Sequence, residues 1–348
     1  MRVIFFFLTL FMLSACSEPE NKAVEVVRAF YFWENNTLAL NSSEEKSLKE
    51  LDVSKLYVKV FEVDRVDGMN TPIAKTSLEL APDRTKGIEE LIPCIYIQNS
   101  VFLASSKEEL ELLAENLTFL VDKYTLKNVA AGTGSYAFKE IQIDCDWTKS
   151  SKKNYFYFLK QLKKQSKKVI SCTLRLYPYK YSDVMGIPPC DKVMLMCYNL
   201  LNPLNNERKN TILDTHEMSK YLDTEVNYPL HIDVALPVYS WMLCYENERF
   251  RGVIHGVDDT ILACMTQDDG LWYTMEKDTV VKDVYMRMGD RVKVERVTTD
   301  QLNEAIELIQ SSGVLDGETV VSFFHLESNE LNNYRHETLD SLYSAFTL

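Results

Sequence analysis

Eight short runs rich in β-branched and aromatic residues punctuate the chain, and most are separated by segments long enough to hold a helix. The runs lie at 29–33, 55–63, 91–98, 138–147, 168–179, 192–200, 230–241 and 319–327. Connections of crossover length favour parallel strands, because tight two-residue loops join only antiparallel ones. Eight parallel strands alternating with helices predict an α/β fold, a (β/α)8 TIM barrel.

The connecting segments carry helix signatures. Residues 42–53 and 105–127 open with serine and glutamate, and 300–313 is amphipathic and ends in glycine. The basic run at 149–168 has apolar residues at helical spacing and is interpreted as a helix with a solvated face. Between strands five and six a helix is missing or very short. Residues 245–298 hold strand-like runs and turns, which predict a small α+β or hairpin insertion between strands seven and eight.

The N-terminus predicts export and lipidation. Residues 1–16 combine one cationic side chain, an apolar run too short for a stable anchor, and small residues before Cys16. The segment 13–16 resembles the lipobox of bacterial lipoproteins, which implies a palmitate-type lipid on Cys16. Residues 17–23 would be a tether whose acidic start resembles a surface-export signal, and 24–348 the barrel. We therefore expect a lipoprotein of the cell envelope, attached to the outer membrane and exposed at the surface.

Charge and cysteine content narrow the partners. The formal net charge of −13 gives no basic patch for phosphate neutralisation, so we expect no nucleic-acid partner. Seven cysteines besides Cys16 form no CxxC pair, and there is no HExxH motif, so we expect neither a metal nor another cofactor. His231 and Asp233 share a strand face, and His231 is interpreted as a satisfied core histidine.

Polar residues alternate along three strands, which indicates that they face the barrel lumen. Activity in barrels lies at the C-terminal strand ends, and carboxylates among aromatic rings suit a sugar. We therefore predict a carbohydrate site. Its catalytic candidates are Asp146, Asp144 and Glu327, and its substrate-binding candidates at this stage are Trp33, Glu34, Gln142, Arg175, Tyr177, Tyr198, Tyr239 and Trp241. The structural alternative is that Asp144 forms an internal ion pair with Arg175.

Three segments resemble motifs of glycoside hydrolase family 18, the chitinase-like group. IQIDCDWT resembles the strand-four pattern D-x-x-D-x-D-x-E through Asp144 and Asp146. VMLMCYNL resembles the strand-six motif M-x-Y-D through Tyr198, with Asn199 at the aspartate position, and this adds Asn199 to the substrate-binding candidates. VALPVYSW resembles the strand-seven segment through Tyr239. The chain also looks like uncharacterised Bacteroidetes lipoproteins with such barrels.

The departures from this family decide the chemistry that we expect. Thr148 occupies the position of the family's catalytic glutamate, and a hydroxyl cannot protonate a glycosidic oxygen at neutral pH. Two hypotheses therefore stay open. In one, the protein is a glycoside hydrolase that uses Asp146 with another carboxylate. The candidates for that carboxylate are Glu34, Glu62, Asp64 and Glu327. In the other, it is an inactive surface module that binds a glycan or a protein.

Overall fold

The computed structural model describes residues 25–34, 40–75, 88–130, 138–222 and 226–347. The predicted signal peptide, the lipidated Cys16 and the tether at 17–23 lie outside these ranges. Among the described residues, no helix combines the length and hydropathy of a membrane span.

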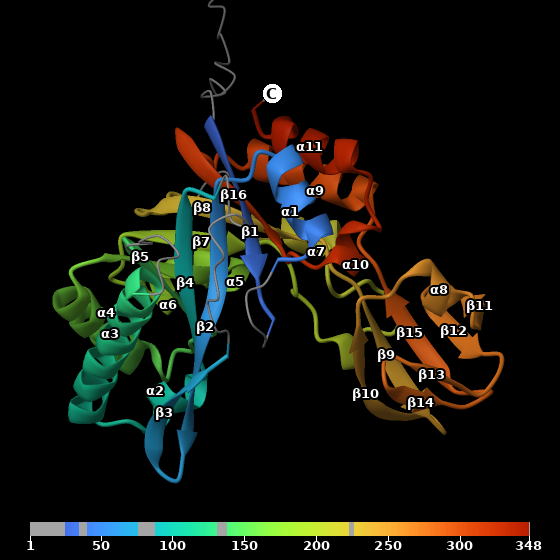
Figure 1. Cartoon of the computed structure of the whole chain (residues 1–348), viewed down its shortest axis with the longest axis horizontal. Coiled ribbons are helices and arrows are strands. Elements are labelled where there is room, and N and C mark those ends of the chain that lie inside the picture. Colours follow the sequence, from blue (N-terminus) through green and yellow to red (C-terminus); the bar gives the residue numbers. More distant parts are fainter. Residues whose placement is uncertain (1–24, 35–39, 76–87, 131–137, 223–225, 348) are drawn as a thin grey trace, which may run out of the picture.

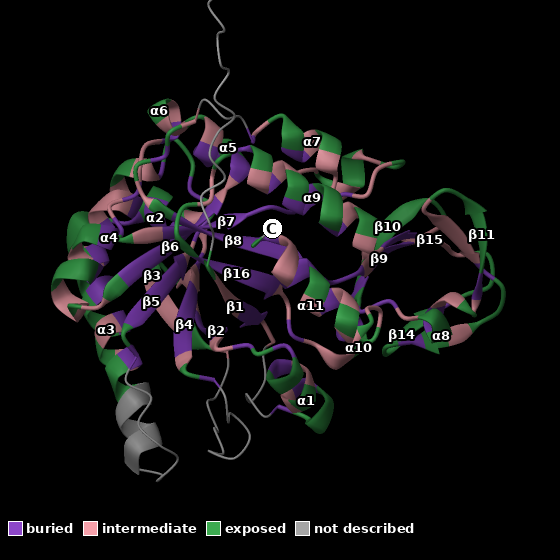
Figure 2. Cartoon of the chain, turned by 90° about the horizontal axis from the view of Figure 1, so that it is seen from above, coloured by how far each residue is buried: buried purple, intermediate pink, exposed green. Residues whose placement is uncertain are grey.

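Eight parallel strands close into a barrel, which confirms the predicted fold. β1 pairs with both β16 and β2, and this completes the ring β1-β16-β8-β7-β6-β5-β4-β2. Figure 2 shows the buried strands at the centre, with helices around them. The strands are β1 (Glu25–Phe32), β2 (Lys55–Val66), β4 (Glu90–Ile97), β5 (Glu140–Asp144), β6 (Val169–Arg175), β7 (Lys192–Met196), β8 (His231–Pro237) and β16 (Glu318–Phe324).

The helices follow from local sequence signals. Capping boxes start α1 at Asn41 and α9 at Thr298. The basic run forms α4 and buries its apolar face, as expected. Two short helices, α5 and α6, fill the interval between strands five and six. The helices outside the insertion are α1 (Ser42–Glu50), α2 (Asn99–Ala104), α3 (Lys107–Ala130), α4 (Lys152–Ser166), α5 (Leu176–Lys180), α6 (Ser182–Met185), η1 (Pro203–Asn205), α7 (Thr215–Ser219), α9 (Thr299–Ser311), α10 (Ser328–Leu331) and α11 (His336–Ala345).

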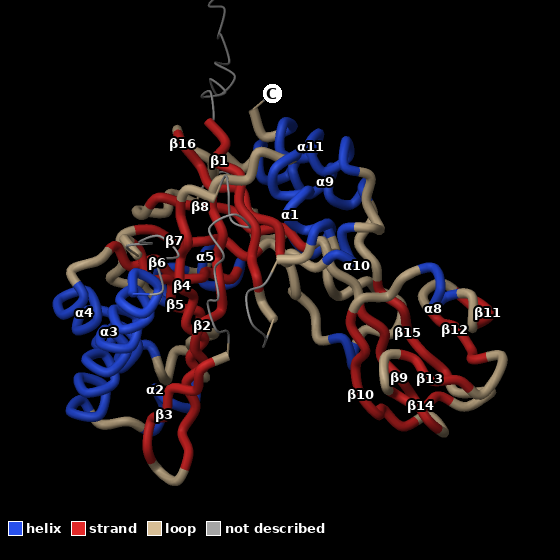
Figure 3. The backbone as a smooth tube through the Cα atoms, in the orientation of Figure 1, coloured by secondary structure: helices blue, strands red, loops and turns tan. Residues whose placement is uncertain are grey.

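β2 continues past the barrel wall into a hairpin that the sequence analysis did not predict. Asp67 and Gly68, both with positive φ, turn the chain into the antiparallel strand β3 (Met69–Ala74). Figures 1 and 3 show this hairpin projecting from the C-terminal end of β2.

The insertion between β8 and β16 is a β-rich lobe with its own apolar core; in Figure 1 it lies at the lower right, while the β2–β3 hairpin lies at the lower left. It starts at Trp241, earlier than the expected residue 245. Its antiparallel sheet has the order β10-β9-β15-β12-β11, beside a two-stranded hairpin. The elements are β9 (Trp241–Glu246), β10 (Arg249–His255), α8 (Asp259–Leu262), β11 (Met265–Asp269), β12 (Trp272–Met275), β13 (Thr279–Val281), β14 (Val284–Met286) and β15 (Arg291–Glu295).

Candidate functional site

Asp146 and Arg175 form a two-pronged ion pair at the C-terminal ends of neighbouring strands. Arg175 donates from Nε to Oδ1 of Asp146 at 2.8 Å and from Nη2 to Oδ2 at 3.1 Å. Nη1 donates a third bond, to the carbonyl of Tyr198 just after the next strand, β7, at 3.3 Å. Because both carboxylate oxygens accept charge-assisted hydrogen bonds, Asp146 is held in one orientation.

Asp144 lies deeper in the lumen. Its Oδ1 accepts a hydrogen bond from the hydroxyl of Thr173 at 2.6 Å. Burial raises the pKa of its carboxyl to about 6. The expected alternative, an Asp144–Arg175 ion pair, is corrected by the structure, because the guanidinium pairs with Asp146 instead. Asp144 is therefore a carboxyl that can change protonation near neutral pH, whereas Asp146 is the one that Arg175 holds in place.

Thr148 belongs to the turn that precedes α4. Its backbone N–H donates to Oγ of Ser151 at 2.8 Å, and the N–H of Ser151 points to the Thr148 hydroxyl at 3.4 Å. Such reciprocal contacts satisfy backbone donors that a helix start leaves open. The residue thus has a local structural role.

Aromatic rings from several strands form one cluster at the mouth. Phe324 is at its centre, with ring centroids 5.4 to 5.7 Å from those of Trp33, Tyr198 and Tyr239. The hydroxyl of Tyr239 donates to Oδ1 of Asn199 at 2.6 Å. The structure therefore brings these predicted residues together around Phe324. The sequence analysis did not name Phe324, although it is two residues from Ser322 on β16 and therefore has its side chain on the same face of the strand.

Gln142 lies one layer below the mouth and is fully buried. Its Oε1 accepts from the hydroxyl of Tyr31 at 2.7 Å and from the thiol of Cys94 at 3.2 Å, while Nε2 has no partner among the described residues. The geometry places Gln142 in the barrel interior, below the aromatic cluster of the mouth.

A second group of predicted residues lies where the insertion leaves the barrel. The ring of Trp241 is 5.6 Å from that of Tyr239. Burial and the negative charge of Glu327 raise the pKa of Glu34. Glu327 follows β16 and is 4.0 Å from Nζ of Lys282 in the insertion. Trp241, Glu34 and Glu327 thus form one flank of the mouth.

Other candidates are placed differently from the expectation. Strand five was expected to continue to residue 179, but it ends at Arg175, and Tyr177 lies on α5 with its ring against Tyr181. Glu62 pairs with Lys75 at 3.0 Å. Asp64 accepts from the N–H of Arg65. Glu62 and Asp64 are therefore engaged within the β2–β3 hairpin.

Histidine and cysteine form no metal centre in the part of the chain that is described. His231 is 3.2 Å from Asp233, which also pairs with Lys192 at 3.0 Å, at the N-terminal end of the barrel. The seven cysteines between Cys94 and Cys264 are free thiols.

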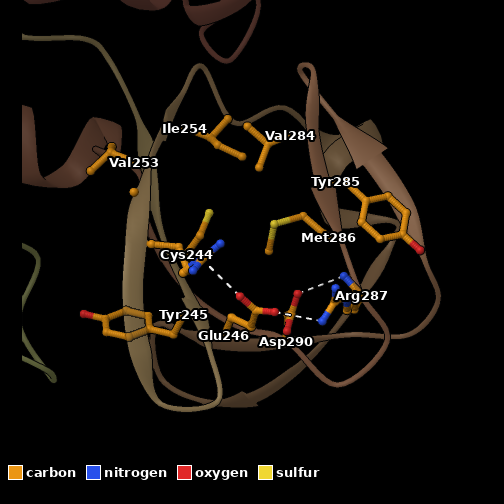
Figure 4. A pocket seen from close by; sticks show the side chains of 12 residues that line it. Cys244, Tyr245, Glu246, Val253, Ile254, Val284, Tyr285, Met286, Arg287 and Asp290 are labelled. Atoms are coloured by element: carbon orange, nitrogen blue, oxygen red, sulfur yellow. Dashed lines mark hydrogen bonds and ion pairs between the residues drawn. The ribbon is translucent and has the colours of Figure 1, made fainter.

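The insertion contains a separate cavity of about 400 Å³ between β10 and β14 (Figure 4). Glu246 lies at its edge and pairs with Arg287 at 2.8 Å and Arg251 at 3.2 Å. None of the residues that the sequence analysis singled out lines it, so the strand ends of the barrel remain the candidate site.

No protein-family model and no curated protein matches the sequence. Three crystal structures illustrate the fold similarity. The group IV chitinase of Ostrinia furnacalis has a TM-score of 0.53 at 9% identity, covering 93% of this chain and 100% of that one. The spore cortex-lytic enzyme SleL of Bacillus megaterium has 0.52 at 14%, covering 92% and 75%. A chitinase of Chromobacterium violaceum has 0.50 at 13%, covering 92% and 97%. At such identities the likeness establishes the barrel fold.

Proposed function

We propose that this protein is a glycan-binding lipoprotein of the bacterial cell envelope that holds carbohydrate at the barrel mouth without cleaving it. The fold shared with chitinases supports a sugar ligand, as do the aromatic cluster and the oriented polar groups beside it.

The Asp146–Arg175 pair carries the non-hydrolytic part of this proposal. Glycoside hydrolysis needs one carboxyl to donate a proton and a second to act as base or nucleophile, about 5 to 9.5 Å away. Each oxygen of Asp146 accepts a hydrogen bond from Arg175, which holds the carboxylate in one orientation, and Thr148, where the sequence resemblance would place the acid, lies in the turn before α4. A fixed ion pair suits sugar hydroxyls, since Asp146 keeps free lone pairs and its side chain is 56% exposed.

The test is a glycan array probed with the purified full chain and with Asp146→Asn and Arg175→Met. We expect wild-type binding to a defined set of glycans, lost or weakened at least ten-fold in both variants, with unchanged circular dichroism. Binding that survives both substitutions would move the site away from the barrel mouth. Absence of binding to bacterial and host glycans alike would overturn the proposal.

Hydrolysis remains the second candidate, and one observation favours it. Asp144 has a pKa of about 6, in the range of a carboxyl that can donate a proton near neutral pH. If Asp144 were the acid, any glycan cleavage would disappear in Asp144→Asn. Cleavage that persists in this variant, or no cleavage by the wild type, would exclude that role.

The envelope location rests on Cys16, which lies outside the described residues. Growth with a radiolabelled or alkyne-tagged palmitate should label the wild-type chain and not Cys16→Ala, and protease added to intact cells should remove the protein if it is exposed on the outer membrane. A Cys16→Ala protein that still carries the label would contradict lipidation at this residue.

A further inference from the structure

Lys59 is a nearly buried lysine on the lumen face of the barrel. It lies on β2 opposite Cys94, which contacts Gln142 inside the lumen. Only 7% of the residue is exposed. Lys59 was not among the sequence candidates.

The ammonium group of Lys59 has no acceptor. Among the described residues, neither a hydrogen bond nor an ion pair within 4.0 Å is formed by its Nζ, which lies 5.2 Å from the ring centre of Trp33. The two nearby carboxylates are engaged elsewhere: Glu62 pairs with Lys75 at 3.0 Å, and Asp144 accepts from Thr173 at 2.6 Å.

Two other lysines of the same chain, Lys192 (side chain 16% exposed) and the fully buried Lys293, show what a structural role requires. Lys192 lies 3.0 Å from both Glu140 and Asp233. Lys293 donates to Glu295 at 2.6 Å and also to two backbone carbonyls. Each ammonium is thus neutralised by carboxylates. Lys59 departs from this pattern, although burial of a cation costs free energy unless it is paired.

Burial lowers the pKa of Lys59, and the attraction of Glu62 opposes this only in part. The ring of Trp33 compensates some of the lost hydration through a cation–π contact. The three N–H donors of the Lys59 ammonium nevertheless have no protein acceptor among the described residues. The ammonium lies beside Trp33, which belongs to the aromatic cluster. A ligand with anionic oxygen atoms would satisfy them.

We propose that Lys59 binds the carboxylate of an acidic sugar residue, a hexuronic acid, within the glycan held at the barrel mouth. This inference rests on the proposed function, because it names the class of glycan that the same site takes. A carboxylate fits better than a phosphate, since the negative charges of Asp144 and Glu62 oppose a second charge on the ligand. Arg175 does not compete for the carboxylate of the ligand, because its Nε and Nη2 already donate to Asp146.

The experiment compares acidic oligosaccharides with their neutral counterparts. Trigalacturonic acid, an alginate trisaccharide and a hyaluronan tetrasaccharide are titrated calorimetrically, each beside its carboxyl-reduced form. The proteins are the wild type, Lys59→Met, Lys59→Arg and the control Lys46→Met, which removes a lysine charge whose side chain is 71% exposed on α1. We expect the wild type to bind at least one acidic sugar ten-fold tighter than its reduced form. Lys59→Met should lose that preference, while Lys59→Arg and Lys46→Met keep it.

Thermal unfolding of Lys59→Met provides a second reading. If Lys59 serves a ligand, removing the unpaired buried charge should leave the melting temperature unchanged or raise it. A large fall in melting temperature would show a structural role and overturn the inference.

The binding data can overturn it as well. This would follow if Lys59→Met lost the same affinity for acidic and for neutral sugars, or if the wild type bound neutral sugars more tightly. Neutral binding without an acidic preference leaves glycan binding intact and refutes only the role of Lys59, whereas no binding to any glycan refutes both.

Discussion

Arg175 donates two hydrogen bonds to Asp146, one to each carboxylate oxygen, at 2.8 and 3.1 Å. The two residues end neighbouring strands, so the pair joins the rim of the barrel where a sugar would rest. Its planar geometry fixes the direction of the remaining lone pairs of Asp146. A rigid acceptor of this kind favours the binding of sugar hydroxyls through the lone pairs that Arg175 leaves open.

Arg175→Lys tests the geometry of this pair, because lysine keeps the charge but cannot bridge both oxygens. We expect glycan affinity, measured by calorimetry, to fall about ten-fold, which corresponds to about 1.4 kcal/mol. Asp259→Asn is the control, since it removes an ion pair whose aspartate is 89% exposed, in the insertion. Wild-type affinity in Arg175→Lys would show that the bridge does not position the ligand.

Asp144→Asn should change how stability depends on pH. The folded-state pKa of about 6 is above the ordinary value of 3.8, so the folded protein binds more protons than the unfolded chain between these limits. The free energy of unfolding of the wild type therefore falls as pH rises from about 4 to about 6. At pH 8 the variant should be more stable by about 2 kcal/mol, which is less than the full shift implies because Asp144 is part exposed. Urea unfolding at pH 4 and pH 8 measures the difference in free energy of unfolding between the variant and the wild type. A difference that is the same at both pH values would contradict the raised pKa of Asp144.

Glu295→Gln should weaken the attachment between the insertion and the loop after β7. Glu295 and Lys293 are fully buried and 2.6 Å apart, and Glu295 also accepts from the N–H and hydroxyl of Thr211. The substitution leaves the Lys293 ammonium buried without a counter-charge, which costs about 3 to 5 kcal/mol. Urea unfolding measures the loss. Asp259→Asn should cost less than about 0.5 kcal/mol, and equal effects in the two variants would refute the importance of burial.

Thr148→Ala should reduce stability without changing glycan binding. The hydroxyl accepts from the N–H of Ser151 in the turn before α4, and loss of one such hydrogen bond costs about 1 kcal/mol. Thr148→Ser keeps the hydroxyl and should behave as the wild type in thermal unfolding. Weaker glycan binding in Thr148→Ala at unchanged stability would place Thr148 in contact with the ligand.

The barrel was predictable because its strands carry strong local signals, and the lumen faces followed from alternation. The sequence could not decide whether Asp144 or Asp146 meets Arg175. The two aspartates are two residues apart on one face, so the choice depends on the stagger between neighbouring strands, which is a property of the closed barrel.

Other differences had signals that were available. Pro178 cannot donate to a strand ladder and suits the first turn of a helix, which marks the end of the strand before Tyr177. Asp67-Gly68 is a common hairpin turn. Lys59 alternates with Val58 and Val60, which indicates a lumen position, but its lack of a partner appears only in three dimensions.

The most direct measurement is the fate of a bound glycan. The tightest ligand from the array is incubated with the wild-type protein at pH 6 and pH 7.5 for a day, and its mass and reducing ends are then determined. We predict that the glycan is recovered intact at both pH values, with its affinity dependent on Arg175. Shortened products formed by the wild type and absent with Asp144→Asn would contradict the proposal and establish a hydrolase.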